Sequence, residues 1–539
     1  MSECEAVFQP DKWRHERGTI PITEDRVPCP KDSLDNSDYC KYHSEPEYHE
    51  QTEEEVFLDL LSEDKDIFAP KFKSIDLNDR EIGERSIHTS KLIHPIINDK
   101  LSICNCDFVN DFTIESGTIG HVNIIDVNTS IELSFSNCTI EGGFHFTGSN
   151  WSEEIKILNT DVWGDSYLKG VYDEEVDFSG SRFGGLININ ESEFRSNLIF
   201  KDCEFWTSII LNDVSVDEEL RMDCILTDFL IHISDCNISN IHVFNEGNSD
   251  RLVRILRSEL KKGRLLQQEK AKTLYDLSQS TLGDVRFEFT SNNVSDFYFN
   301  DTNYSDFDFT QMHNQLRNAD WQLHNFSIDN KTVNSYIKEK ISGPEAGKAH
   351  SLYDHTFEMR NNVETYIKAK ERASRQGDSQ SASQFLINEM RAKRKKRAHH
   401  LSTSTLRTRE KWRLKLSQWK NKFLDITCGY GEQPWKAAAW AAGIPLISGF
   451  ILYPLLGGVH ETESGRQLTF DINGSLDPSI IIDVVGANLY FSILTFSTIG
   501  SSSYSPATFW SALLMAFESL LGPFFVALFV FTLGKQVTR

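Results

Sequence analysis

The chain has 539 residues, a length typical of about three or four domains, and its 79 acidic against 55 basic residues give a net charge of −24 at pH 7. This negative charge argues against nucleic acid as a partner of the whole molecule. The ten cysteines do not resemble the disulfide framework of a small secreted protein, and the N-terminal sequence MSECEAVFQPDKWRHERG lacks the apolar core of a signal peptide. We therefore expect the N-terminus to lie in the cytoplasm.

Potential metal ligands gather in the N-terminal segment, residues 1–50. They are Cys4, Cys29, Cys40 and His43, the last two within the sequence CKYH. Thiolate and imidazole ligands suit a closed tetrahedral zinc site, in which the ion replaces a hydrophobic core that the segment is too small to build. We expect a structural zinc ion here. The alternative is three unrelated thiols and a surface histidine.

Residues 101–248, which follow an expected linker over 51–100, repeat large apolar residues at a step of eleven. The members of the first row are Phe178, Ile189, Phe200, Leu211, Met222 and Ile233. A second row begins five positions later in the sequence and consists of Phe183, Phe194, Phe205, Val216 and, after Thr227, Ile238. These spacings fit neither a helical face nor a plain strand, but they fit a β-solenoid in which each row forms one wall of the interior. The intervening Asp, Asn, Ser and Gly suit tight corners, whereas a β-sandwich, the alternative, would not keep this register.

The pattern is similar to that of pentapeptide-repeat proteins, in which a central Phe or Leu recurs about every five residues. The resemblance implies a right-handed β-helix in the cytoplasm. A ten-residue step through Phe287, Phe297 and Phe307 indicates further turns over residues 283–335. The solenoid could sense a ligand, transmit a protein contact or simply add bulk.

Two other regions have helical patterns. In residues 249–282, Leu252, Ile255 and Leu260 fall near one side of a helix with Arg and Lys around them, which predicts a helical insertion in the solenoid. Residues 344–400 predict an antiparallel cytoplasmic helix pair with a break at Gly377.

A densely basic run, Lys393 to Arg397, lies in the second helix of this pair. Beside a membrane, such a run faces anionic lipid headgroups or marks the cytoplasmic side.

The C-terminal region, residues 434–539, holds two apolar segments that are long enough to cross a hydrocarbon core of about 30 Å. Ala437–Leu456 carries no charge and Phe509–Leu533 carries one. Basic residues precede the first segment and follow the second, whereas acidic residues dominate the connection. The positive-inside rule therefore predicts a multi-pass protein of the cell membrane with both termini in the cytoplasm. The basic, Trp-bearing sequence 404–433 predicts a helix lying along the inner lipid surface.

Between these segments lies a third apolar sequence, which reaches from IIID to STIG. Its part from Asn488 to Gly500 is too short to cross the membrane, so we expect a re-entrant helix that returns as extended chain. The adjoining FSTIGSSSYSP has five serines and no charge. Non-helical backbone is tolerated at this depth only where it packs in protein or lines water. The serines are therefore expected to line an aqueous path.

The order of span, re-entrant helix, turn, proline and span resembles the pore domain of the tetrameric potassium-channel superfamily in its two-transmembrane form. The resemblance is carried by Thr495, Thr498, Ile499, Gly500 and Pro506. Together with the repeats, the chain resembles pentapeptide-repeat channels of bacteria and archaea. The resemblance implies a homotetramer whose filter presents the carbonyls of Thr498, Ile499 and Gly500, and the Thr498 hydroxyl, to a passing cation.

The outer part of the expected filter departs from the family pattern. Where the family has Tyr-Gly-Asp, this chain has Ser501, Ser502 and Ser503. The tyrosine braces the family's filter, and the glycine supplies backbone angles that cost another residue about 1 kcal/mol or more. We therefore expect two inner ion sites, with Ser501 and Ser502 at a widened outer end, and weak selectivity between K⁺ and Na⁺. A potassium-selective channel is the alternative.

Two features of the second span have possible pore roles. Glu518 is its only acid, and an intramembrane carboxylate normally faces water or a partner. We expect it either to meet Thr495, Ser497 or cavity cations, or to serve as a structural acid. Gly522 and Pro523 interrupt the helical hydrogen bonds at mid-span and are expected to form a gating bend, the alternative being a lipid-facing kink.

No phosphate loop, Ser/His/Asp grouping or catalytic Cys/His pair stands out, so we expect no enzymatic activity. The sequence favours a cation channel gated through its cytoplasmic solenoid by an unidentified ligand or protein. The alternative is a non-conducting, membrane-anchored scaffold whose solenoid binds a partner protein.

Overall fold

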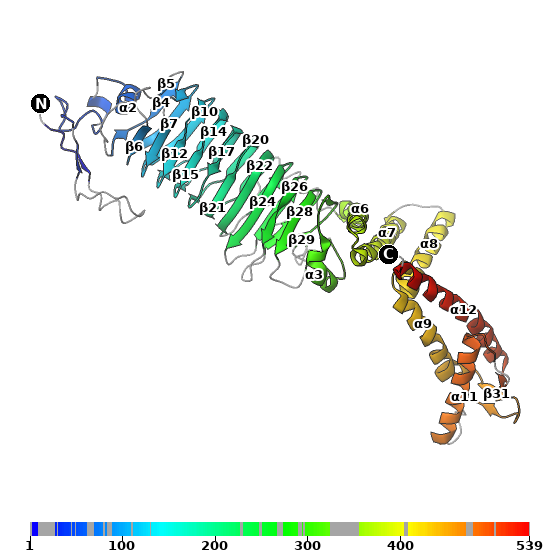
Figure 1. Cartoon of the computed structure of the whole chain (residues 1–539). Helices are drawn as coiled ribbons and strands as arrows, with labels where there is room; N and C mark the ends of the chain where they lie inside the picture. The colour runs from blue at the N-terminus through cyan, green and yellow to red at the C-terminus, as the bar shows by residue number, and fades with distance from the viewer. Residues whose placement is uncertain are drawn as a thin grey trace. The chain divides into compact units, whose positions relative to one another are not determined.

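The computed structural model divides the chain into two compact units, Met1–Asp378 and Ser379–Arg539. It describes all residues except 1–2, 9–26, 30, 45, 49, 62–68, 79–80, 83–88, 109–110, 130, 227–229, 247–250, 267–272, 289–293, 295–296, 324–354, 404–407, 470–477, 501–502 and 538–539. Figure 1 shows both units, and each has its own fold.

The first unit is a β-solenoid whose strands stack turn upon turn (Figure 1). Its strands are β3 (Lys71–Phe72), β4 (Ile75–Asn78), β5 (Glu81–Ile82), β6 (Thr89–Ile93), β7 (Ile96–Cys104), β8 (Asp107–Phe108), β9 (Asp111–Glu115), β10 (Thr118–Ile125), β11 (Asn128–Thr129), β12 (Leu133–Ser136), β13 (Thr139–Ile140), β14 (Phe144–Trp151), β15 (Ile155–Leu158), β16 (Asp161–Val162), β17 (Ser166–Tyr172), β18 (Val176–Asp177), β19 (Arg182–Phe183), β20 (Ile187–Phe194), β21 (Leu198–Phe205), β22 (Ile209–Leu226), β23 (Leu230–Ser234), β24 (Asn237–Glu246), β25 (Arg251–Leu256), β26 (Glu259–Leu266), β27 (Thr273–Asp276), β28 (Thr281–Glu288), β29 (Phe297–Tyr298) and β30 (Asn303–Tyr304).

One turn of the coil takes 21 or 22 residues over most of this length. Phe178 stacks on Phe200 with ring centroids 4.9 Å apart, and the two residues are 22 positions apart. Ile189, eleven positions after Phe178, instead pairs in parallel with Leu211 on another ladder. The eleven-residue rows therefore alternate between two walls. The expectation that each row builds a single wall was wrong, because two steps of eleven complete one turn.

The corners of the coil use residues that tolerate left-handed backbone. Positive φ recurs at steps of ten or eleven residues, or of 21 or 22 residues, and the residues concerned are mostly Asn, Asp or Gly, including Asn105, Asp126, Asn137, Gly148, Asn159, Gly180, Asp202 and Asp213. Short polar side chains bond to the local backbone and lower the cost of this conformation. The polar residues between the apolar rows therefore define where each strand ends.

The predicted helical insertion at 249–282 was wrong, because this region forms β25, β26, β27 and the start of β28. Leu252 pairs with Leu230 of the preceding turn, so the apolar residues assigned to a helical face are wall residues of the coil. The expected linker at 51–100 likewise contains β3 to β6 and part of β7.

A polar ladder crosses three turns of this region. His232, Arg254 and Asp276 are paired on successive turns and are all buried. The Arg254 Nε atom lies 3.6 Å from Asp276 Oδ2. Burial and the neighbouring Arg254 lower the pKa of His232 to about 3, so the imidazole stays neutral beside the ion pair.

Helices cover both ends of the coil. At the first turns, α2 (Glu53–Leu61) packs Phe57 against Phe72 and Phe112, with ring centroids 5.6 and 6.5 Å apart. At the last turns, η2 (Phe309–Met312), α3 (His313–Asn318) and α6 (His355–Gln376) follow the strands. The α6 side chain of Lys368 bonds to Asp301, with its Nζ atom 2.5 Å from Oδ1. Solenoids need such caps, because their terminal strands otherwise expose unpaired backbone groups.

The second unit is helical. It consists of α7 (Ser379–Thr403), α8 (Thr408–Cys428), η3 (Gly429–Gly431), α9 (Pro434–Ile447), the π-helical turn η4 (Ser448–Leu452), α10 (Tyr453–Leu455), α11 (Pro478–Phe496) and α12 (Phe509–Val537), with a small sheet of β31 (Val459–Glu461), β32 (Gln467–Leu468) and β33 (Tyr504–Pro506). Among the described residues, two helical segments are long and apolar enough to span a membrane, Pro434–Leu455 and Phe509–Gln536. The predicted break at Gly377 falls at the boundary between the two units, so α6 and α7 belong to different units.

We predict that the stacked aromatic rings stabilise the solenoid. Phe200→Ala removes a fully buried ring from the stack with Phe178, and should lower the free energy of unfolding by about 3–5 kcal/mol. Thermal unfolding of the purified chain, followed by circular dichroism in the β region, measures this loss. Trp206→Ala is the control, because Trp206 is 48% exposed. Equal losses for both variants would contradict the assignment of Phe200 to the core.

Candidate functional site

The helix α11 is held between the two apolar helical segments by close backbone contacts. A Cβ atom on Gly449 would lie 2.5 Å from the Leu489 Cα atom, and one on Gly522 would lie 1.8 Å from the Phe496 carbonyl oxygen. Only glycine fits at such distances. Gly522 therefore has a packing role in this structure, beside the bend expected from Gly522 and Pro523.

The chain leaves α11 through a strained turn. Thr498 has a φ of 60° and Gly500 a φ of 78°, both in the left-handed region. For a threonine this conformation costs about 1–2 kcal/mol, and strain of this kind gathers at functional sites. The Thr498 N–H bonds to the Thr495 carbonyl, and the Ile499 N–H to the Leu494 carbonyl, each at 3.1 Å. Ile499, between Thr498 and Gly500, is 75% exposed.

Beyond the turn, the described chain resumes in the small sheet. Ser501 and Ser502 lie outside the described residues, and β33 then pairs antiparallel with β31. Tyr504 of β33 contacts Tyr490 of α11, with ring centroids 6.1 Å apart. Tyr504 also packs against a buried cluster that joins the sheet to α11. The sequence reasoning missed this tyrosine pair.

Glu518 of α12 is buried among three helices. It is 1% exposed, and its Oε2 atom accepts a hydrogen bond of 2.8 Å from the Tyr453 hydroxyl. Its Oε1 atom accepts a hydrogen bond from the hydroxyl of Ser492 in α11. The same hydroxyl oxygen lies 3.0 Å from the Pro445 carbonyl oxygen. Thr495, an expected partner, contacts the Tyr453 hydroxyl instead. We call Tyr453, Ser492 and Glu518 the interhelical cluster, and its burial favours the structural interpretation of this acid.

Ser497, the other expected partner, lies apart from the interhelical cluster. Its side chain is exposed, and its hydroxyl donates to the Leu494 carbonyl at 3.1 Å. A sequence signal for the cluster exists only in part, because Glu518 stands out in an apolar helix while Tyr453 and Ser492 do not.

At the opposite end of α12, Glu432 joins three parts of the chain. Its Oε2 atom accepts a hydrogen bond of 2.7 Å from the Ser383 hydroxyl of α7, and its Oε1 atom lies 2.5 Å from the Lys535 Nζ atom of α12. Glu432 follows a tight elbow in which Tyr430 has a φ of 59°. Burial and the neighbouring Asp425 raise the pKa of Tyr430 to about 12, so its hydroxyl stays neutral. We call Ser383, Glu432 and Lys535 the inner joint.

The basic run of α7 pairs with α8. Asp425 lies 3.0 Å from Arg394 and 3.2 Å from Arg391, measured between side-chain oxygen and nitrogen atoms. Arg397 donates to the Ser417 hydroxyl at 2.9 Å. Arg394 and Arg397 of this run thus bind α8, whereas Lys395 and Lys396 are exposed, and the contact with lipid headgroups stays a prediction.

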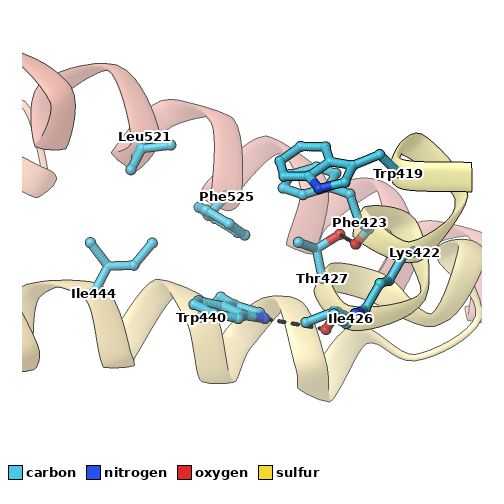
Figure 2. A pocket seen from close by; sticks show the side chains of 9 residues that line it. All are labelled: Trp419, Lys422, Phe423, Ile426, Thr427, Trp440, Ile444, Leu521 and Phe525. Carbon is cyan, nitrogen blue, oxygen red and sulfur yellow. Dashed lines mark hydrogen bonds between the residues drawn. The ribbon is translucent and has the colours of Figure 1, made fainter. Parts of the chain in front are cut away.

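The helix α8 has an exposed apolar stripe at helical spacing, made of Trp412, Leu416, Trp419, Phe423 and Ile426. Where this stripe meets α9 and α12, the side chains surround an apolar cavity of about 500 Å³ (Figure 2). The Trp440 indole donates to the Ile426 carbonyl at its edge, at 3.2 Å. An apolar stripe flanked by Lys and Arg is typical of a helix that lies in a membrane surface.

The N-terminal Cys and His residues also come together. One ligand atom from each of Cys4, Cys29, Cys40 and His43 lies within 4.8 Å of the others. This group lies in the first unit, with the solenoid.

We predict that Gly522 is required for the contact between α12 and α11. Gly522→Ala forces the two helices apart and should lower the free energy of unfolding by about 1–3 kcal/mol. Gly534→Ala is the matched control in the same helix, because a Cβ atom there meets nothing within 4 Å. Thermal unfolding in detergent measures the stability of both variants. Equal unfolding midpoints for the two would contradict the close contact of Gly522 with α11.

We also predict that Glu518 holds the interhelical cluster together. Glu518→Ala removes the acceptor of the buried Tyr453 hydroxyl and leaves the Ser492 hydroxyl with the Pro445 carbonyl alone, and should cost about 1–3 kcal/mol. Glu518→Gln keeps an acceptor oxygen and should cost less. Ser519→Ala is the control, because the Ser519 hydroxyl bonds within its own helix to the Met515 carbonyl. A denaturation midpoint for Glu518→Ala as high as that of Ser519→Ala would be inconsistent with this role.

A family model described as an ion channel matches residues 481–539, which run from α11 through the strained turn to the end of the chain. No curated protein and no solved structure matches the chain. The match supports an ion channel of the potassium-channel-like superfamily. The chain is thus a β-solenoid joined through helices to two apolar C-terminal helical segments that carry an ion-channel domain.

Proposed function

We propose that the chain assembles as a homotetrameric channel of the cell membrane that conducts monovalent cations with weak selectivity between K⁺ and Na⁺. The filter consists of the turn Thr498, Ile499 and Gly500, followed by Ser501 and Ser502. Both termini and the solenoid lie in the cytoplasm, and α8 lies along the inner lipid surface.

One observation carries this proposal: a single copy of the chain leaves the turn uncovered. Thr498 is exposed and strained, Ile499 is 75% exposed, and the backbone here is not helical. Hydrocarbon does not tolerate such backbone, which persists only where it packs in protein or lines water. Further copies arranged around a common axis would cover the Ile499 side chain and leave the carbonyl oxygens facing a water-filled path.

The matched residues and the helix order support the same conclusion. The family match includes α11, the turn and α12, and α11 lies between two segments long enough to span the membrane. The alternative, a non-conducting anchor, needs no strained polar turn at membrane depth.

Weak selectivity follows from the residues after Gly500. Selectivity for K⁺ depends on several carbonyl-lined sites in series, which replace the hydration shell of the ion. The serines at 501–503 lack the glycine that would continue a left-handed backbone without strain. A filter with only two inner sites would discriminate less between the two cations.

The inner joint offers a route from the cytoplasmic helices to the pore. Glu432 contacts α7 through Ser383 and α12 through Lys535. A displacement of α7 would therefore move Glu432, which is the partner of Lys535 in the last turn of α12. A ligand or protein bound by the solenoid would act on the pore through this contact.

The decisive experiment is the current carried by the purified chain in planar lipid bilayers. We expect cation current whose reversal potential in opposed K⁺ and Na⁺ solutions lies near zero. Gly500→Val should abolish it, since valine is strained at a φ of 78°, whereas Gly534→Ala should conduct normally.

A current with strong preference for K⁺ would refute the two-site filter while leaving the channel intact. If the tetrameric chain carries no current under any condition, the scaffold function is favoured. If the purified protein in detergent has the mass of a single chain, the chains do not meet around a common axis, and the proposed filter is excluded.

A further inference from the structure

The strongest cluster of metal-ligating side chains outside the pore is the group Cys4, Cys29, Cys40 and His43, here called the Cys–His cluster. The Cys29 and Cys40 sulfurs are 3.6 Å apart, and the His43 Nδ1 atom lies 3.2 Å from the Cys40 sulfur and 3.7 Å from that of Cys4. A disulfide needs sulfurs about 2.05 Å apart, so the thiols are free.

These distances match the edges of a zinc tetrahedron. Zinc binds sulfur at about 2.3 Å and imidazole nitrogen at about 2.0–2.1 Å, which gives edges of about 3.8 Å between sulfurs and about 3.5 Å between sulfur and nitrogen. Three thiols and one imidazole complete four-fold coordination and leave no open position, as in structural rather than catalytic sites.

The local backbone brings the ligands together from distant positions. The strands β1 (Val7–Phe8) and β2 (Val27–Pro28) pair antiparallel, and the pairing continues past them, where the Cys29 N–H donates to the Ala6 carbonyl and the Cys4 N–H to the Lys31 carbonyl. Cys4 and Cys29 are therefore two positions apart in register on neighbouring segments. The Cys40 N–H donates to the Cys4 sulfur at 3.2 Å, and the His43 N–H donates to the Cys40 carbonyl at 3.0 Å. Backbone donors to ligand sulfur are a common support of metal sites.

The same segment is bonded to the first turn of the solenoid. The Lys71 N–H, at the start of β3, donates to the Tyr42 carbonyl at 2.9 Å, and the Tyr42 side chain is fully buried. Next to it, Lys41 bonds to Asp59 of α2 at 2.7 Å. The turn between Cys40 and His43 therefore carries residues that pair with the exposed edge of the coil.

We propose that the Cys–His cluster binds one zinc ion, and that this ion fixes the N-terminal segment as the cap of the first solenoid turn. A segment this short buries too little apolar surface to fold alone, and metal ligation supplies the missing stabilisation. The ion holds the Cys40–His43 turn in the conformation that pairs Tyr42 with Lys71. This role is independent of conduction.

Elemental analysis of the full-length chain in detergent tests the site. We expect one zinc ion per chain, retained by Cys104→Ser and lost from Cys40→Ser. Cys104 is a matched control, because it is partly buried in the solenoid outside the cluster. Cobalt(II) exchanged into the unmodified chain should give a thiolate-to-metal absorption band. This measurement does not depend on whether a cysteine variant folds.

Hydrogen exchange tests the capping role. Removing zinc with a chelator should speed amide exchange at Lys71 and Phe72 in β3, while exchange in β21 stays unchanged. Absence of zinc, iron in its place, or zinc retained by Cys40→Ser would overturn the site. Unchanged exchange in β3 after complete removal of the metal would overturn the cap.

Discussion

Every backbone N–H and C=O that leaves water must find a partner, and this requirement determines both units of the chain. In the solenoid, each interior strand that the structure describes pairs with the strands one turn before and one turn after it, so the unpaired edges among these strands lie at the two ends. Helix α2 and the Cys–His cluster cover the first end, and α6 covers the last. In the membrane unit the same requirement makes the turn after α11 dependent on neighbouring protein or water.

The sequence predicted the solenoid because its apolar residues follow a period that belongs to no other common fold. It misassigned residues 249–282 because wall residues spaced three to five apart, such as Leu252 and Ile255, also fit one face of a helix. Nothing local separates the two patterns, since the deciding fact is the pairing of Leu252 with Leu230 a full turn away. The step of eleven was visible, but its assignment to alternate walls depends on the length of the complete turn.

In the membrane unit, the resemblance to the potassium-channel pore pointed to Thr498 and Gly500, and Glu518 stood out as the one acid of an apolar helix. The sequence did not identify the partners of Glu518, since Tyr453 and Ser492 reach it from other helices and neither is unusual in its own segment. The sequence also did not reveal the close contacts of Gly449 and Gly522, because their partners lie in another helix. Gly449 is needed because another helix passes close to it, and no local spacing reports that approach.

The two ends of the spanning helices are held by different chemistry. Near the turn, a buried cluster and a small sheet fix α11 against its neighbours. At the other end, the Glu432 side chain is 4% exposed, pairs with Lys535, whose side chain is 32% exposed, and accepts a hydrogen bond from Ser383. Removing one partner of a buried ion pair leaves a charge without compensation, which is costly. Each end is therefore held by a buried carboxylate, Glu518 near the turn and Glu432 near α7.

The turn length of the solenoid, 21 or 22 residues over most of the coil, has a consequence for how this protein can vary. Deleting or duplicating one whole turn of 21 or 22 residues would keep the corners and walls in phase, and would change the length of the coil by one strand spacing, about 4.8 Å. A change that is not a whole number of turns would shift apolar side chains out of the interior. The solenoid can therefore become longer or shorter during evolution in steps of one complete turn.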